Sequence, residues 1–184
     1  MHHACFASAV RDRAVFGADD VACCPDTDTS GRDRTWILAD AHAGTESAVD
    51  DALVDLLEFG ARLRVELIIL GDLFAGWLGR RSFATSSQRR VLDALVALRE
   101  RGGYVRFVVG NRDYLVTDET LDAFDRVHDG FVFVRFPAAP TLLLHGHGID
   151  ARDRGYARWH RLSRHPTVTR LLARLPSLAG LALA

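Results

Sequence analysis

The chain has 184 residues and a formal net charge of −1, because 23 basic residues nearly balance 24 acidic ones. This length suits one domain with its own core, and the balanced charge excludes a global positive field for binding nucleic acid. The three cysteines lie within the first 24 residues without a C-x-x-C spacing, which favours a reducing, cytoplasmic setting. The start lacks a signal-peptide pattern, and no apolar run reaches the roughly 20 residues of a membrane span.

The first 34 residues carry little pattern, and we expect a poorly ordered extension there. Beyond it, short apolar runs alternate with helical patterns. Strands separated by helices of this length are typical of an α/β domain with a largely parallel sheet. The pattern predicts strands at 35–39, 65–70, 104–109, 131–136 and 141–144, and helices from Thr45 as N-cap, at 85–101, from Thr117 or Asp118 through Val127, and at 152–163 and 167–175.

Polar side chains follow four of these strands, at the point where each strand ends. In open α/β sheets this carboxyl edge is where ligands bind. Carboxylate, amide and imidazole groups are ligands that suit Mn, Fe and Zn. The sequence therefore predicts a metal site at the strand ends, built from Asp40, His42, Asp72, Asn111 and His145.

The spacing of these residues suggests how ions are held. Asp40 and His42 are two positions apart, so on an extended strand their side chains point to the same side and can hold one ion. Asp72 can bridge two ions with its two oxygens. Two ions about 3.5 to 4 Å apart can activate water and clamp a phosphate. Arg112 is placed to bind phosphate oxygens and stabilise developing charge.

The order Asp40-x-His42, Gly71-Asp72, Gly110-Asn111 and His145 resembles that of the calcineurin-like metallophosphoesterases. The resemblance implies a layered α/β sandwich and a two-metal centre, taken here as two Mn²⁺ ions. It makes Asp40, His42, Asp72, Asn111 and His145 metal ligands. Most members carry a catalytic histidine after the asparagine. Here Arg112 stands in that place, and Asn111 and Arg112 are the expected catalytic residues.

Gly-Asn-Arg-Asp and the segment Gly71-Asp72-Leu73-Phe74-x-x-Trp77-x-Gly79 resemble one branch, the UDP-2,3-diacylglucosamine hydrolases of lipid A synthesis. The tail with Asp153-x-x-Tyr156 is similar to the start of that branch's helical lipid-binding cap. The chain then divides into an extension (1–34), a metallophosphoesterase core (35–150) and a cap-like segment (151–184). The resemblance implies cleavage of a lipid-linked nucleotide sugar at its pyrophosphate, with peripheral contact at the cytoplasmic face of the inner membrane.

The chain departs from the family in one respect. Members carry a Gly-His-x-His motif after the cap that gives each metal another ligand, and this sequence lacks it. The spacing of His145-Gly146-His147 from Asn111 favours the earlier histidine motif. His147 is then a substitute ligand, a residue beside the site or a solvated histidine, and the last two interpretations are favoured. We expect five ligands of seven, as in a truncated or frameshifted product. The alternatives are a hydrolase for another phosphoester and an inactive remnant or binding module.

Several residues also have a purely structural interpretation. Arg112 can form an ion pair with Asp113 and still bind phosphate. Trp77 can pack in the core or line a substrate groove, and Tyr156 can contact lipid or belong to a solvated helix face. The arginines of the C-terminal helices are typical of a solvated face. The sequence makes no prediction of oligomeric state.

Overall fold

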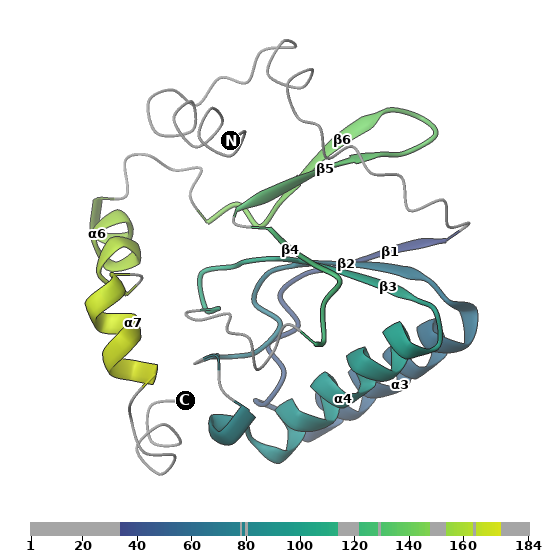
Figure 1. Cartoon of the computed structure of the whole chain (residues 1–184), viewed down its shortest axis with the longest axis horizontal. Helices are drawn as coiled ribbons and strands as arrows, with labels where there is room; N and C mark the ends of the chain where they lie inside the picture. The colour runs from purple at the N-terminus through teal and green to yellow at the C-terminus, as the bar shows by residue number, and fades with distance from the viewer. Residues whose placement is uncertain are drawn as a thin grey trace.

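The computed structural model describes residues 34–77, 79, 81–113, 122–128, 130–147, 154–163 and 165–173. The expected extension therefore lies almost entirely outside the described residues, as does the helix start expected at Thr117 or Asp118. Within the described part, β-strands and helices alternate along the core, so the predicted α/β class is confirmed (Figure 1).

The central sheet has four parallel strands in the order β1-β2-β3-β4. Its strands are β1 (Thr35–Leu38), β2 (Glu66–Leu70), β3 (Tyr104–Val108) and β4 (Arg126–His128). The prediction of a helix running through Val127 is wrong, because Val127 pairs with Phe107 in the sheet. Pairing with a neighbouring strand overrides the local helical pattern at this position.

Two helices, α3 (Ser47–Leu63) and α4 (Ser86–Glu100), cover one face of this sheet, with the short 3₁₀ turn η1 (Arg81–Phe83) before α4. Alternate residues of β2 explain the packing, because Leu67 and Ile69 belong to the core shared with both helices. Thr85 caps α4, accepting from the Gln88 amide while the Gln88 side chain accepts from the Thr85 amide.

The N-cap of α3 differs from the prediction. Glu46, not Thr45, is the N-cap residue, and its side chain makes no capping hydrogen bond. The Thr45 hydroxyl instead donates to the carbonyl of His42 at 3.0 Å. The hydroxyl thus stabilises the loop that carries a predicted metal ligand rather than the helix itself.

An antiparallel hairpin, β5 (Phe131–Arg135) and β6 (Pro140–Leu144), covers the opposite face of the sheet. Ile68 and Val108 of the sheet pack against Val132 and Val134 of the hairpin in a second small core. The strand before His145 is therefore in a separate sheet, not in the parallel one as its strand-end pattern suggested. Helices, parallel sheet and hairpin together form the expected layered arrangement.

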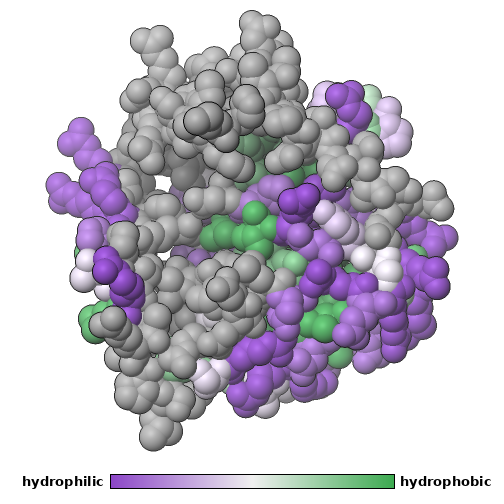
Figure 2. Space-filling model, viewed as in Figure 1, coloured by the Kyte–Doolittle hydropathy of each residue, from purple (hydrophilic) through white to green (hydrophobic). Residues whose placement is uncertain are grey.

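The C-terminal described elements are α6 (Arg154–Ser163) and α7 (Pro166–Ala173), which match the two predicted helices. They lie to one side of the layers in Figure 1. Figure 2 shows hydrophilic residues predominating over the region of α3 and α4 on the face in view. Among the described residues, no helix is long and apolar enough to cross a membrane.

Candidate metal centre

The predicted ligands after β1 and β2 lie in loops with an unusual backbone. Asp40, His42 and Asp72 all have positive φ angles, of 51°, 47° and 50°. Non-glycine residues adopt this left-handed conformation at a cost, and such residues cluster at functional sites. The extended-strand spacing inferred for Asp40 and His42 is therefore wrong, since β1 ends at Leu38. The side chains of Asp40 and His42 lie near each other because both residues have the left-handed backbone conformation.

Backbone hydrogen bonds hold these loops against each other. The amide of His42 donates to the carbonyl of Asp72 at 3.0 Å, and that of Ala43 donates to Leu73 at 2.9 Å. The loop after β2 is joined in turn to the loop after β3, because the Trp77 amide donates to the Arg112 carbonyl at 3.2 Å. Pairing thus continues beyond the strand ends and restricts where the ligands can move.

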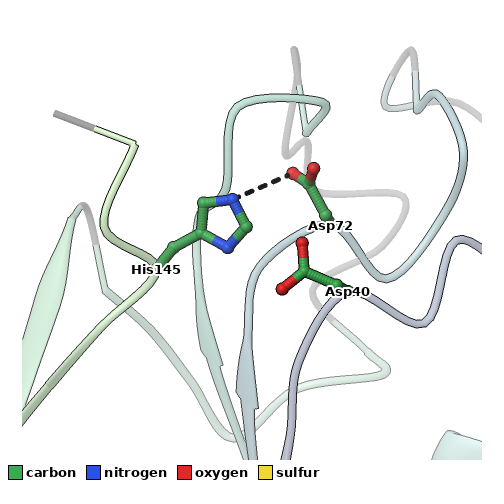
Figure 3. Close-up of side chains that lie close together, drawn as sticks. All are labelled: Asp40, Asp72 and His145. Atoms are coloured by element: carbon green, nitrogen blue, oxygen red, sulfur yellow. Dashed lines mark ion pairs between the residues drawn. The ribbon is translucent and has the colours of Figure 1, made fainter.

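Asp40, Asp72 and His145 form a group that can hold a metal ion. Each offers one ligand atom, and these atoms all lie within 4.8 Å of one another. In Figure 3 the three side chains converge from three different segments, with Asp72 opposite the imidazole of His145. Asp72 is 2% exposed, whereas the side chain of Asp40 is 58% exposed. The group is therefore buried at Asp72 and open to solvent at Asp40.

The imidazole of His145 is oriented by the end of β2. Its Nδ1 lies 2.7 Å from the carbonyl oxygen of Leu70, which can only accept, so Nδ1 carries the proton. In the neutral ring, Nε2 then presents a lone pair. Nε2 lies 2.8 Å from Asn111 Oδ1 and 3.6 Å from Asp72 Oδ1. Electron-rich atoms thus converge on one point, as a cation requires.

The two carboxylate oxygens of Asp72 face different neighbours. Oδ1 faces His145, while Oδ2 lies 3.4 Å from Nε2 of His42. The same His42 nitrogen is 3.8 Å from Asp40 Oδ1. Oδ1 also accepts from the backbone amide of Arg112 at 2.8 Å. The structure therefore brings all five predicted ligands to one place, with Asp72 in the middle.

Two glycines allow the ligand loops to approach each other. A Cβ on Gly71, which has φ +76°, would lie 2.6 Å from Gly110 Cα and 2.8 Å from His145 Nδ1. A Cβ on Gly110 would overlap Oδ1 of Asp72. Each glycine directly precedes a predicted ligand, and this close approach explains why both motifs begin with glycine.

Arg112 and Asp113 have partners that the sequence did not predict. Arg112 lies with Nε 3.6 Å from Asp72 Oδ2 and donates from Nη1 to the Ala75 carbonyl at 3.3 Å. Its side chain is 46% exposed, so the guanidinium remains accessible to a ligand. Asp113 Oδ2 accepts from the amides of Asp72 and Gly110, at 2.9 and 2.7 Å. Asp113 therefore bonds to backbone rather than orienting the guanidinium.

The carboxyl group of Asp113 is 1% exposed. Burial raises its pKa from 3.8 to about 6, because the charged form loses hydration. The amides of Gly110 and Asp72 oppose the rise by bonding to the carboxylate. The charge of Asp72 adds to the rise in pKa, and His145 opposes it. The group thus exchanges its proton near neutral pH in the metal-free chain.

The remaining predicted residues lie outside this cluster. Trp77 is 5% exposed, and its ring is tilted against that of Phe74 in the helix-side core, which favours the packing interpretation over a substrate groove. Tyr156 falls within α6, but its side chain lies outside the described part of the chain. The ring of His147 is centred 5.2 Å from that of His145, beside the cluster, as expected for a residue next to the site.

No protein-family model matches the chain. The chain is 34% identical over 143 residues to a UDP-2,3-diacylglucosamine hydrolase of Pseudomonas fluorescens (strain SBW25), covering 76% of this chain and 57% of that protein. It is 36% identical over 149 residues to the protein of that name from Azotobacter vinelandii (strain DJ / ATCC BAA-1303), covering 77% and 59%. The chain thus spans less than two thirds of these relatives. By motif order and sequence, the chain is a relative of the UDP-2,3-diacylglucosamine hydrolases, and its described core has a layered α/β fold.

Proposed function

We propose that the strand-end cluster is a two-ion centre. Asp40, His42 and Asp72 Oδ2 would hold one ion, and Asp72 Oδ1, Asn111 and His145 the other. The 3.4 and 3.6 Å separations of the two histidines from opposite oxygens of Asp72 support this division. A carboxylate between two nitrogen ligands is the arrangement that a bridging role requires.

The donor set fits Mn²⁺. Carboxylate and amide oxygens suit hard divalent ions, and imidazole extends the choice to Mn, Fe and Zn. The Leu70 carbonyl that orients His145 is the kind of partner that metal-bound histidines commonly have. These features of the apo chain support a metal site without reference to activity.

The proposed activity is hydrolysis of the pyrophosphate of UDP-2,3-diacylglucosamine. The oxygen of water bonds to one phosphorus, and the bond from that phosphorus to the bridging oxygen breaks. The products are UMP and an acylated sugar phosphate. Divalent ions lower the pKa of bound water and polarise phosphoryl oxygens. Arg112, accessible beside Asp72, would bind the phosphate and stabilise its developing charge.

One observation carries this proposal: Asp40, Asp72, Asn111 and His145, from four separate segments, converge at one edge of the sheet. The relatives' name supplies the substrate class. The acylated substrate implies peripheral contact with the cytoplasmic face of the inner membrane, with Tyr156 as a substrate contact. Trp77 would support the site from the core.

The test has two stages. The purified chain is saturated with Mn²⁺ and desalted, and bound metal is counted beside Asp72→Ala. We expect two retained ions, both lost in the variant. UMP release from UDP-2,3-diacylglucosamine in mixed micelles is then measured. Metal retention without UMP release would contradict the proposed activity.

A substrate panel separates the alternatives. Nucleoside diphosphates, bis-p-nitrophenyl phosphate and a phosphopeptide are offered to the same Mn-loaded chain. Cleavage of one of these in place of the lipid nucleotide would identify a hydrolase for another phosphoester. Saturable binding of UMP with no turnover of any substrate would identify a binding module.

A further inference from the structure

The buried side chain of Asp113 lies between the two central ligand loops. Oδ2 of Asp113 accepts from the amides of Asp72 and Gly110, at 2.9 and 2.7 Å. One amide belongs to a predicted ligand, and the other immediately precedes Asn111. A single oxygen atom thus joins the loop after β2 to the loop after β3.

The oxygen binds the backbone at the two positions from which the side chains of Asp72 and Asn111 enter the site. The amide of Asp72 belongs to a residue with φ 50°, a conformation that its own side chain disfavours. The amide of Gly110 lies where the loops approach so closely that neither Gly71 nor Gly110 has room for a Cβ. Buried amides without a partner are costly, so removing the acceptor would favour separation of the loops.

We propose that Asp113 is a positioning residue that sets the separation between Asp72 and Asn111. It acts through the two backbone amides and touches no reacting group. The inference concerns the metal centre and to that extent rests on the proposed function. The loop-to-loop connection itself exists in the metal-free chain and can be measured there.

The rest of the Asp113 carboxylate is consistent with this role. Oδ1 is buried, and no described residue forms a hydrogen bond with it. Only one oxygen is therefore needed, and an asparagine side chain can supply it. The variant Asp113→Asn keeps the acceptor and removes the charge, whereas Asp113→Ala removes both.

The first measurement is Mn²⁺ affinity, which is determined from the electron paramagnetic resonance signal of free Mn²⁺. Loss of a group that orients metal ligands costs about 10- to 100-fold in affinity, and we expect this for Asp113→Ala. Asp113→Asn should bind within about threefold of wild type, a difference well under 1.4 kcal/mol. Equal weakening in both variants would overturn the proposal, because the charge and not the hydrogen bonds would then matter.

The matched control is Glu66→Gln. Glu66 is another buried carboxylate, at the opposite end of β2, where it accepts from Arg106 Nε at 2.7 Å. This variant should lower the midpoint of unfolding and leave Mn²⁺ affinity unchanged. If Glu66→Gln weakens Mn²⁺ affinity as much as Asp113→Ala does, general destabilisation explains both losses. That result would overturn the proposal.

Amide hydrogen exchange in the metal-free chain gives the second, independent readout. The amides of Asp72 and Gly110 should exchange at least about tenfold faster in Asp113→Ala and keep their protection in Asp113→Asn. Unchanged exchange in the alanine variant would overturn the positioning role. If wild type binds no Mn²⁺, the proposed function fails, and hydrogen exchange alone decides the role of Asp113.

Discussion

His145 Nδ1 lies 2.7 Å from the carbonyl oxygen of Leu70, although 75 positions separate the two residues. The contact joins the hairpin on one face of the sheet to the end of β2. It also determines which nitrogen of the imidazole faces Asp72 and Asn111. Packing of the hairpin on the sheet therefore also orients a proposed metal ligand.

This contact predicts the effect of removing the imidazole. His145→Ala should weaken Mn²⁺ binding at least about tenfold, because a ligand is lost from a site that depends on ligand number. Isothermal titration with Mn²⁺ measures the effect. His147→Ala is the neighbouring control and should retain most of the affinity. Equal losses in the two variants would contradict the assignment of His145 as the ligand.

Substitution of two glycines with positive φ distinguishes the effect of backbone strain from that of steric crowding. Gly71→Ala should destabilise the chain by more than Gly130→Ala, although both residues have φ above +70°. A Cβ at Gly130 meets nothing within 4 Å, so that variant incurs only the conformational cost of about 1 kcal/mol. At Gly71 the Cβ meets Gly110 Cα at 2.6 Å, which forces the loops apart. Urea unfolding of both variants tests the difference, and equal losses would refute the crowding argument.

Asp113 predicts a pH dependence of stability in the metal-free chain. Its folded pKa is raised to about 6, so the folded state binds the proton more tightly than the unfolded state. The resulting stability is fully present below pH 3.8, is lost as pH rises through about 6, and amounts to roughly 3 kcal/mol. Urea unfolding between pH 4.5 and 7.5 should show this decline in wild type and a smaller one in Asp113→Asn. Parallel curves would contradict it.

Arg112 should affect phosphate binding without affecting the metal. Its side chain is exposed, and its backbone amide, which alanine retains, donates to Asp72 Oδ1. Arg112→Ala should keep two Mn²⁺ ions and lower kcat/KM by about 10²- to 10³-fold, as for a lost charge-stabilising donor. UMP titration of the Mn-loaded variant gives a separate readout of phosphate affinity. Metal loss in Arg112→Ala would show a structural role instead.

The two threonines before α3 and α4 test the capping assignment. Thr85→Ala removes a hydroxyl that caps α4 and should cost about 1 kcal/mol of unfolding free energy. Thr45→Ala should cost less than half of that, because its exposed hydroxyl caps no helix. Chemical unfolding of the two variants makes the comparison. A larger loss at Thr45 would contradict the observed N-cap of α3.

Much of the fold followed from local patterns. Apolar runs predicted β1, β2 and β3 to within a residue or so, because short, largely apolar runs between turn signals favour strands. The helix through Val127 and the cap at Thr45 were wrong for a shared reason. Both depend on what the segment meets in space, namely β3 in one case and the His42 carbonyl in the other.

The sequence by itself determined that the residues after β1, β2 and β3 meet in the candidate site, because parallel strands place their carboxyl ends at one edge of a sheet. His145 follows β6 of the antiparallel hairpin, so its place in the site depends on how the hairpin packs on the sheet. Only the tertiary structure decided how they meet. The left-handed turns at Asp40, His42 and Asp72, the bond from His145 to Leu70 and the oxygen of Asp113 between two loops all join segments that are distant in sequence. Such contacts arise from packing the hairpin and the loops together, and no local pattern of residues specifies them.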